Sequence, residues 1–206
     1  MTPSQSPAPI IWLDSAESTN KYLRMASGTS DNLSVAAALE QTEGRGQGTH
    51  TWHSRKGENL TFSILFRPER LAAGDILILT CAVTAGIRDY LGEEGVSSRI
   101  KSPNDIWVGD RKICGILIEN TLTEGFVRES IIGVGFNLNQ DSWPEDLPNP
   151  VSLSQLTGRK YELRPELERL AEKICRRLAM TGSNTGRKVL QEEFEKNVFR
   201  LTGVPA

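Results

Sequence analysis

The sequence lacks three features that would each point to a particular class of protein. No apolar run approaches the roughly 18 residues that a bilayer-spanning helix needs, which argues against a membrane protein. Neither sign of charge is in excess, since 24 Lys and Arg face 26 Asp and Glu, which argues against DNA binding. Cysteine is scarce and odd in number, with Cys81, Cys114 and Cys175 each inside an apolar segment. That pattern fits neither a disulfide framework nor a zinc site, so we expect a reducing compartment, the cytoplasm.

A secretory signal is also missing from the start of the chain. Residues 1–9 have no positive segment followed by an apolar stretch, and we expect a flexible lead-in rich in Pro and Ser. The remaining length suits one full-sized domain, which we place at residues 10–200.

Apolar patterning predicts the secondary structure of this domain. Short β-rich segments predict strands at residues 10–13, 35–40, 60–66, 99–100, 106–108, 113–119 and 130–138. Helical spacing predicts helices near 20–26, over 75–91, over 167–178, and over a segment marked by Leu190, Phe194, Val198 and Leu201. Strands therefore dominate residues 10–140 and helices dominate the rest. This segregation predicts an α+β fold, a mixed β-sheet packed with helices, rather than a doubly wound arrangement.

A glycine-rich segment between two predicted strands is the first candidate site. Gly44, Gly46 and Gly48 alternate around Arg45, so backbone N–H groups and a guanidinium could together face an anion. Trp52 in the same polar segment is a candidate for stacking on a flat heterocycle. A flexible hairpin connection without a ligand is the alternative.

The histidines of the same segment, His50 and His53, have no third ligand placed beside them in the sequence. No metal site is therefore predicted from a side-chain cluster, and exposed polar residues are the expected interpretation.

Lysines beside short apolar strands form the second candidate site. Lys101 and Lys112 aimed at one pocket would neutralise a carboxylate that meets a triphosphate, whereas solvated turn lysines are the alternative. Asn104 could read an adenine edge, and Gly115 would let a ligand approach the strand backbone. At residues 133–135 two glycines indicate either a bulge or a close ligand contact, and residues 18–20 could simply cap a helix.

Taken together, these segments resemble the biotin protein ligases. The resemblance spans residues 10 to about 157 and rests on the order and spacing of its motifs, which are ESTN at 17–20, QTEGRG at 41–46, WHS at 52–54, GENL at 57–60, KSPND at 101–105, KICGILIE at 112–119 and GVGFN at 133–137. It implies a fold related to class II aminoacyl-tRNA synthetases and lipoate ligases. It also implies an enzyme that joins biotin to ATP, with Mg²⁺, giving biotinyl-5′-adenylate, and transfers biotin to a lysine of a biotin carboxyl carrier protein.

The resemblance also implies roles for individual residues. Lys112 would bridge the biotin carboxylate and the α-phosphate and, with Arg45, act in catalysis. The implied biotin contacts are Ser18, Thr19, Gln41, Gly44, Arg45, Gly46, Lys112, Gly115 and Gly133. The implied nucleotide contacts are Trp52, Lys101, Asn104, Asp105 and Asn137, with Mg²⁺ near Asp105.

Several features qualify the resemblance. Ser102 stands where the family usually has tryptophan, and Gln47 stands where some members carry a second arginine. No helix-turn-helix precedes residue 10, so a monofunctional ligase is expected, and residues 201–206 look like the start of the SH3-like domain that the family commonly carries. A lipoate or octanoate ligase of the same fold and a non-catalytic biotin-binding regulatory module are the alternatives. A homodimer is left open.

Overall fold

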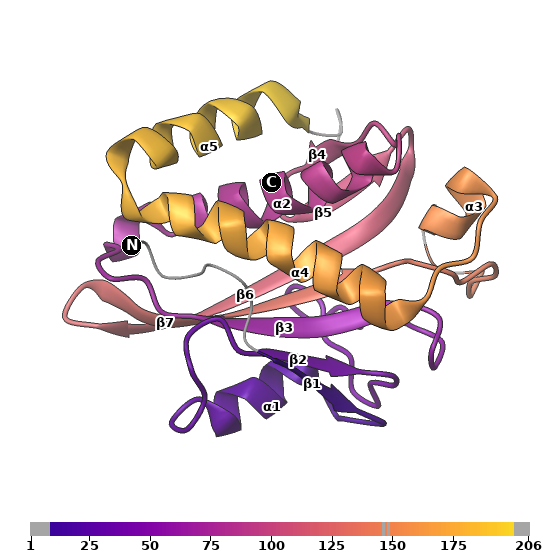
Figure 1. The fold of residues 1–206 in the computed structure, drawn as a ribbon, viewed down its shortest axis with the longest axis horizontal. Coiled ribbons are helices and arrows are strands. Elements are labelled where there is room, and N and C mark those ends of the chain that lie inside the picture. The colour runs from indigo at the N-terminus through magenta and orange to yellow at the C-terminus, as the bar shows by residue number, and fades with distance from the viewer. Residues whose placement is uncertain (1–8, 146, 148, 200–206) are drawn as a thin grey trace.

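The computed structural model describes residues 9–145, 147 and 149–199 (Figure 1). Both the predicted lead-in, apart from residue 9, and the predicted start of an SH3-like domain lie outside these residues. The strands are β1 (Ile10–Leu13), β2 (Val35–Ala38), β3 (Leu60–Phe66), β4 (Arg99–Lys101), β5 (Asp105–Val108), β6 (Arg111–Thr123), β7 (Phe126–Phe136) and β8 (Val198–Phe199). The helices are α1 (Thr19–Ala26), α2 (Leu77–Glu93), α3 (Leu153–Thr157), α4 (Leu163–Ala179) and α5 (Asn184–Asn197), with 3₁₀ turns at Ala73–Asp75 and Met180–Gly182.

All eight strands form one mixed sheet in the order β1-β2-β3-β7-β6-β5-β4-β8. The pairs β1–β2 and β4–β8 are parallel, and the pairs between them are antiparallel. The predicted α+β fold with a mixed sheet is therefore confirmed.

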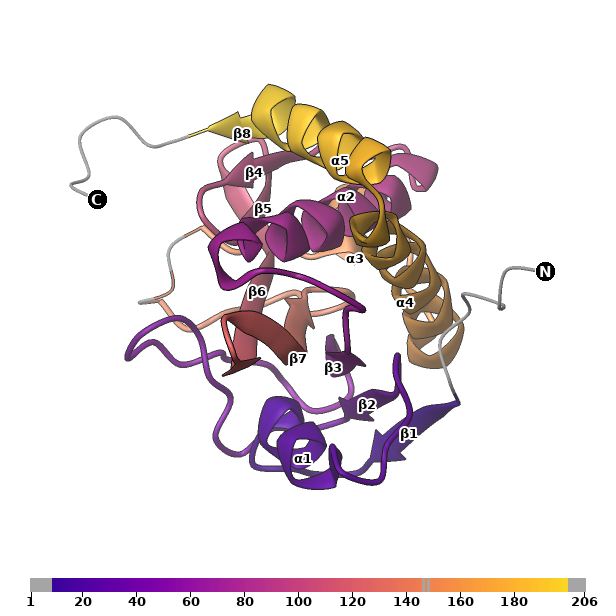
Figure 2. The ribbon, with the colours of Figure 1, turned by 90° about the vertical axis from the view of Figure 1, so that its left-hand side faces the viewer.

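Helices cover both faces of the sheet (Figures 1 and 2). On one face, α2 packs against α4 and α5 and closes the main core, whereas α1 packs on β2, β3 and β7 from the other face. The central strand β3 shows the result, because all seven of its residues are buried and Phe62 faces the main core while Leu65 faces α1. Gly86 permits the close crossing of α2 and α4, since a Cβ there would lie 2.7 Å from the Ile174 Cα.

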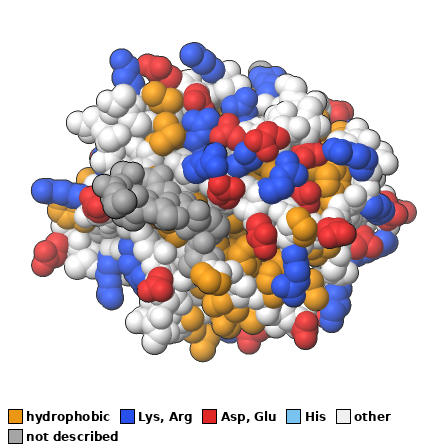
Figure 3. Space-filling view, viewed as in Figure 1, with side chains coloured by type: hydrophobic (Ala, Val, Ile, Leu, Met, Phe, Trp, Pro, Cys, Tyr) orange, Lys and Arg blue, Asp and Glu red, His pale blue; other side chains and the backbone are white. Residues whose placement is uncertain are grey.

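The outer face of the α2–α4 layer carries charges of both signs. Arg169, Lys173 and Arg177 form ion pairs with carboxylates on α2, α4 and α5. Figure 3 shows blue and red side chains interleaved on this face rather than gathered by sign. Among the described residues no helix combines the length and the apolar character needed to cross a bilayer.

Two differences from the predicted elements have clear physical causes. The last helix ends at Asn197, and Val198 lies in β8, so the prediction of a helix through Val198 is wrong, while Leu201 lies outside the described residues. Pairing with β4 takes these residues out of the helical pattern. The short helix α3 was not predicted, although Ser152 and Gln155 form a capping box at its start.

The hairpin of β6 and β7 is longer than predicted. It extends to a turn at Glu124 and Gly125, both of which have positive φ, as the tight turns of hairpins require. This long hairpin forms the middle of the sheet and carries the surface on which the candidate site is built.

Candidate active site

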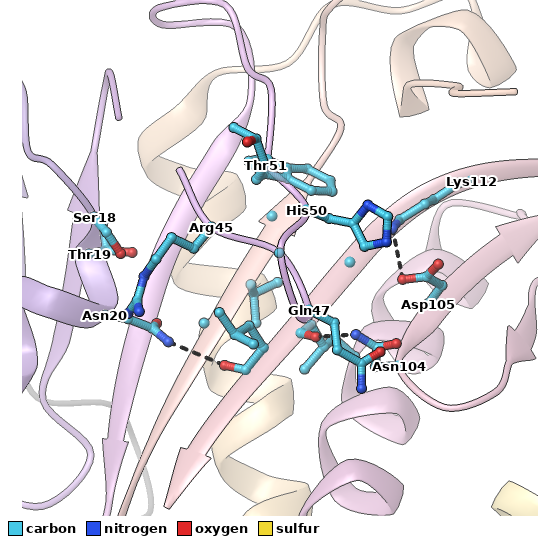
Figure 4. Close-up of a pocket in the computed structure, with 18 of the residues that line it drawn as sticks. Ser18, Thr19, Asn20, Arg45, Gln47, His50, Thr51, Asn104, Asp105 and Lys112 are labelled. Atoms are coloured by element: carbon cyan, nitrogen blue, oxygen red, sulfur yellow. Dashed lines mark hydrogen bonds and ion pairs between the residues drawn. The ribbon is translucent and has the colours of Figure 1, made fainter. Parts of the chain in front are cut away.

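One cavity brings together most of the residues selected from the sequence. It has a volume of about 270 Å³ and lies between the start of α1, residues 41–52, the β4–β5 turn and the strands β6 and β7 (Figure 4). The selected residues that line it are Ser18, Thr19, Gln41, Arg45, Gly46, Trp52, Lys101, Asn104, Asp105, Lys112, Gly115 and Gly133. The cavity has two chemically different ends.

The polar end is built on the first turn of α1. Gln41 Oε1 accepts hydrogen bonds from the Thr19 backbone N–H at 2.9 Å and from the Thr19 hydroxyl at 3.2 Å. Ser63 Oγ on β3 lies 2.7 Å from Thr19 Oγ1 and 2.6 Å from Asn20 Oδ1. Ser18 occupies the position before the helix, but its hydroxyl makes no capping hydrogen bond, so it remains directed to the cavity lining. The buried network fixes this end of the cavity before any ligand arrives.

Glycines on β6 and β7 form the floor. A Cβ on Gly135 would lie 2.2 Å from Trp52 Cε2, and one on Gly115 would lie 2.9 Å from Trp52 Cζ3. A Cβ on Gly133 would lie 2.4 Å from Asn20 Oδ1. The register of β7 against β3 is continuous here, so close contact rather than a bulge explains these glycines.

The cationic end is built on β6 and the β4–β5 turn. Lys112 Nζ lies 2.8 Å from Asp105 Oδ1 and 5.6 Å from the centre of the Trp52 ring. Lys101 Nζ lies 4.9 Å from the centre of the Trp107 ring. Asn104 Nδ2 donates to the Ile116 carbonyl at 2.6 Å, which ties the turn to β6. The two lysines therefore line one cavity, as predicted, each with a partner from this chain.

Residues 44–52 form a small antiparallel turn above the floor. The Gly46 N–H donates to the His50 carbonyl at 2.7 Å, and the Trp52 N–H donates to the Gly44 carbonyl at 3.0 Å. The Arg45 side chain points to the polar end, beside Asn20 and across the cavity from Lys112 and Asp105 (Figure 4). Its Nη2 lies 3.1 Å from both carboxylate oxygens of Glu119 on β6.

Two of the selected residues do not line the cavity. Asn137 is 3% exposed, and its Nδ2 donates to the carbonyls of Lys112 and Val151 at 3.3 and 3.1 Å, so it braces the backbone that carries Lys112. Gly44 is buried against the loop itself, because a Cβ there would lie 2.5 Å from the Trp52 carbonyl oxygen. Both residues therefore support residues that line the cavity, Asn137 at Lys112 and Gly44 at Trp52.

The histidines and cysteines contribute no metal site among the described residues, where no three His, Cys, Asp or Glu side chains gather as ligands. His50 lines the cavity singly. The three cysteines are free and buried, and burial raises the pKa of the Cys81 thiol to about 11 and that of Cys175 to about 12.

Comparison with known proteins gives the family. The model of the biotin/lipoate A/B protein ligase family matches residues 12–137, which is more than half of the chain and includes every residue of the floor and the cationic end. The chain belongs to this family. The sequence resemblance is thereby confirmed at the level of the family, and so is the fold relationship to lipoate ligases, whereas the relationship to class II aminoacyl-tRNA synthetases stays a prediction.

Individual relatives of this ligase-family chain carry more specific names. The bifunctional ligase/repressor BirA of Bacillus spizizenii is 33% identical over 157 residues, which is 74% of this chain and 48% of that protein. The human biotin–protein ligase is 31% identical over 137 residues, which is 64% of this chain and 19% of that protein. The structure of a biotin protein ligase from Aquifex aeolicus in complex with biotin and ATP matches with a TM-score of 0.78 and 26% identity, covering 92% of this chain and 78% of that one. The chain spans about half the length of the BirA relative.

Sequence reasoning missed Asn20, which lines this ligase-family cavity, and two residues that support it from outside the lining, Ser63 and Glu119. Ser63, Asn20 and Glu119 form a polar network with Thr19 and Arg45, although Asn20 and Glu119 lie inside the motifs that carried the resemblance. The sequence predicts no role for Asn20 beyond a helix cap. For Ser63, the available signal was a serine at the centre of β3, a mostly apolar strand whose other polar residue is Thr61.

Proposed function

We propose that this chain is the catalytic part of a biotin protein ligase. In the first step, a biotin carboxylate oxygen attacks the α-phosphorus of ATP, and pyrophosphate leaves, which gives biotinyl-5′-adenylate. In the second, the amine of a lysine in a biotin carboxyl carrier protein attacks the acyl carbon, and AMP leaves. The single observation that carries the proposal is the cavity that joins a hydrogen-bonding end to a cationic end, in a chain that resembles proteins named biotin–protein ligase.

The polar end suits a neutral ring with donors and acceptors, such as the ureido group of biotin. We assign Ser18, Thr19 and Gln41 to that ring, because all three line the cavity and Thr19 is already held by hydrogen bonds to Gln41 and Ser63. The backbone at Gly115 and Gly133, together with Arg45 and Gly46 of the turn that Gly44 supports, would enclose the biotin body. The carboxylate of a ligand enclosed in this way would extend along the glycine floor toward the cationic end.

The cationic end suits the meeting of two anions. We assign Lys112 to the space between the biotin carboxylate and the α-phosphate, where a positive charge stabilises the added negative charge of the transition state. When the nucleotide binds, the Lys112 ammonium would exchange its partner Asp105 for the α-phosphate. Lys101, Asn104 and Trp52 are assigned to the nucleotide, and Asn137 acts on it through the backbone of Lys112.

Mg²⁺ would accompany the ATP. The ion is commonly held by one or two carboxylates together with phosphate oxygens and water, and Asp105 is the carboxylate that lines this cavity. This donor set fits a metal that arrives with the nucleotide rather than one held by a protein cage. Bound Mg²⁺ would neutralise part of the charge on the phosphates.

Two alternatives are distinguished by one assay. A lipoate or octanoate ligase of the same family would exchange pyrophosphate into ATP with those acids, and a non-catalytic binding module would not exchange at all. We expect exchange that depends on biotin and is at background with lipoate, octanoate or no acid. Exchange supported equally by octanoate, or none with biotin, would contradict the proposal.

The proposed partners follow from the same reaction. The protein substrate is a biotin carboxyl carrier protein or the carrier domain of a biotin-dependent carboxylase, and a homodimer remains an open arrangement. The near balance of charge supports the absence of a DNA partner, and the three free, buried cysteines support a place in the cytoplasm.

A further inference from the structure

Three side chains from two separate elements, the loop and α1, converge on the carboxylate of Glu119. Arg45 Nη2, from the turn above the floor, lies 3.1 Å from both oxygens. Arg24 Nη2 and Asn20 Nδ2, both from α1, lie 3.0 and 2.8 Å from Oε2. Glu119 itself comes from β6, at the polar end of the cavity. One carboxylate thus joins the loop, the helix and the sheet.

The contact from the loop stands out because the neighbouring loop residues make none like it. In residues 45–51, all of which the structure describes, Arg45 is the only side chain with a hydrogen bond or ion pair. The loop is otherwise held at its two ends, by the N–H groups of Thr42 and Glu43 donating to carbonyls before α1 and by Trp52 on the glycine floor. The ion pair is therefore the side-chain tether of the middle of the loop.

The direction of Arg45 separates this contact from a phosphate site. Its guanidinium lies beside Asn20, whereas Lys112 and Asp105 lie across the cavity (Figure 4). Exposed ion pairs usually contribute little. Arg45 is 50% exposed, but Glu119 is only 23% exposed, and Asn20, which is 3% exposed, fixes its orientation by donating to Oε2. Pre-oriented groups lose less conformational entropy when they pair, so the tether is more effective than a typical surface pair.

We propose that Glu119 is a positioning residue that fastens the loop over the polar end of the cavity through Arg45. It thereby holds the backbone at Gly44–Gly46 against the ligand that binds there. The identity of that ligand as biotin rests on the proposed function, but the tether itself does not. Removing the charge of Glu119 should loosen the loop and weaken binding at the polar end, with little effect at the cationic end.

The test uses Glu119→Gln, with Arg24→Gln as the matched control, because Arg24 contacts the same carboxylate from α1 and not from the loop. Trypsin cleavage after Arg45 in the ligand-free protein, followed by mass spectrometry, should be about fivefold faster in Glu119→Gln and within twofold of the unmodified chain in Arg24→Gln. The KM for biotin should rise about fivefold in Glu119→Gln, while the KM for ATP changes less than twofold.

Three further variants guard against misfolding as the cause. Arg45→Lys, which keeps a charge for Glu119, should retain most of the biotin affinity. Arg45→Gln combined with Glu119→Gln should be no weaker than Arg45→Gln alone, because the tether is already lost. Unchanged cleavage in Glu119→Gln, equal effects in Arg24→Gln, or additive losses in the double variant would overturn the proposal. If cleavage accelerates but no acid supports pyrophosphate exchange, the tether stands and the ligase function fails.

Discussion

The two ends of the cavity achieve their order in different ways. At the polar end, neutral groups of Thr19, Asn20 and Ser63 bond to one another and stay buried. At the cationic end, Lys112 is held by Asp105, and Lys101 lies over the Trp107 ring. The first end is complete without a ligand, whereas the second holds charges whose partners must be exchanged when an anion enters.

The difference indicates which end sets specificity and which sets rate. A preformed neutral network recognises shape and hydrogen-bond pattern at little reorganisation cost, because its polar groups are already satisfied. A lysine that trades a carboxylate for a phosphate contributes most when negative charge accumulates between the reactants. We therefore expect damage to the polar end to raise the KM for the acid, loss of Lys112 to lower kcat, and crowding of the Trp52 ring to raise the KM for ATP.

The largest effect should come from Lys112→Ala. Loss of the cation between two anions should lower biotin-dependent pyrophosphate exchange by about 10²-fold or more, while far-UV circular dichroism stays unchanged. Lys56→Ala is the control, because Lys56 pairs with Glu40 outside the cavity and its loss should leave exchange within twofold. Near-normal exchange in Lys112→Ala would remove the cationic end from the mechanism.

A matched pair of substitutions on β7 should separate the two ends. Gly133→Ala places a methyl against Asn20 and should raise the KM for biotin about tenfold. Gly135→Ala places a methyl against the Trp52 ring and should instead raise the KM for ATP about tenfold. Gly28→Ala, which meets no atom within 4 Å, controls for the added methyl. The same change in both KM values for the two variants would mean that the ends do not act separately.

A smaller effect is expected from Ser63→Ala. The substitution removes the hydroxyl shared by Thr19 and Asn20, which should cost ~1 kcal/mol of biotin binding, or about fivefold in Kd. Isothermal titration with biotin measures the change. A Kd that stays within experimental error of the unmodified chain would show that the network serves folding alone. Thr157→Ala, which removes a hydroxyl bonded to Leu153 outside the cavity, is the matched control.

The smallest expected effect concerns the free energy of unfolding and two buried thiols, Cys81 on α2 and Cys175 on α4, which should have no effect at neutral pH. Burial raises the pKa of Cys81 to about 11 and that of Cys175 to about 12, so both remain protonated well above their ordinary value of 9.0. In the unfolded chain they lose protons from about pH 9 upward, so the free energy of unfolding should fall from there to about pH 11 and stay unaffected by these thiols at pH 7–8. Urea unfolding across this range measures it. A flat profile would contradict the assigned burial.

Local patterns in the sequence predicted most of the elements and the floor of the site. Period-two alternation marked β3, and a wide apolar stripe marked α2 with its buried Leu79, Val83 and Ile87. β8 escaped prediction because two residues gain their conformation only by pairing with β4, a contact between segments far apart in the chain.

The site residues that sequence reasoning missed were missed for the same reason, because their roles depend on contacts between segments far apart in the chain. Motif order selected Ser18, Gln41 and Lys112, because these lie in compact segments that can be recognised singly. The role of Glu119 depends on contacts among α1, the loop and β6. Asn137 supports the backbone of Lys112 instead of lining the cavity, because it also bonds to the carbonyl of Val151, which is distant in sequence from Lys112. Neither follows from spacing along the chain.

The β6–β7 hairpin has a consequence for how the protein folds. Residues 111–136 carry Lys112 and all three floor glycines in one antiparallel hairpin, so half of the cavity can form from neighbouring residues at a low cost in loop closure. The turn at Arg45 and the start of α1 must reach that surface from far upstream. We therefore expect the anion-binding half to acquire protection from hydrogen exchange earlier during refolding than the half that recognises the acid, so that the molecule assembles its reaction centre before its means of selecting a substrate.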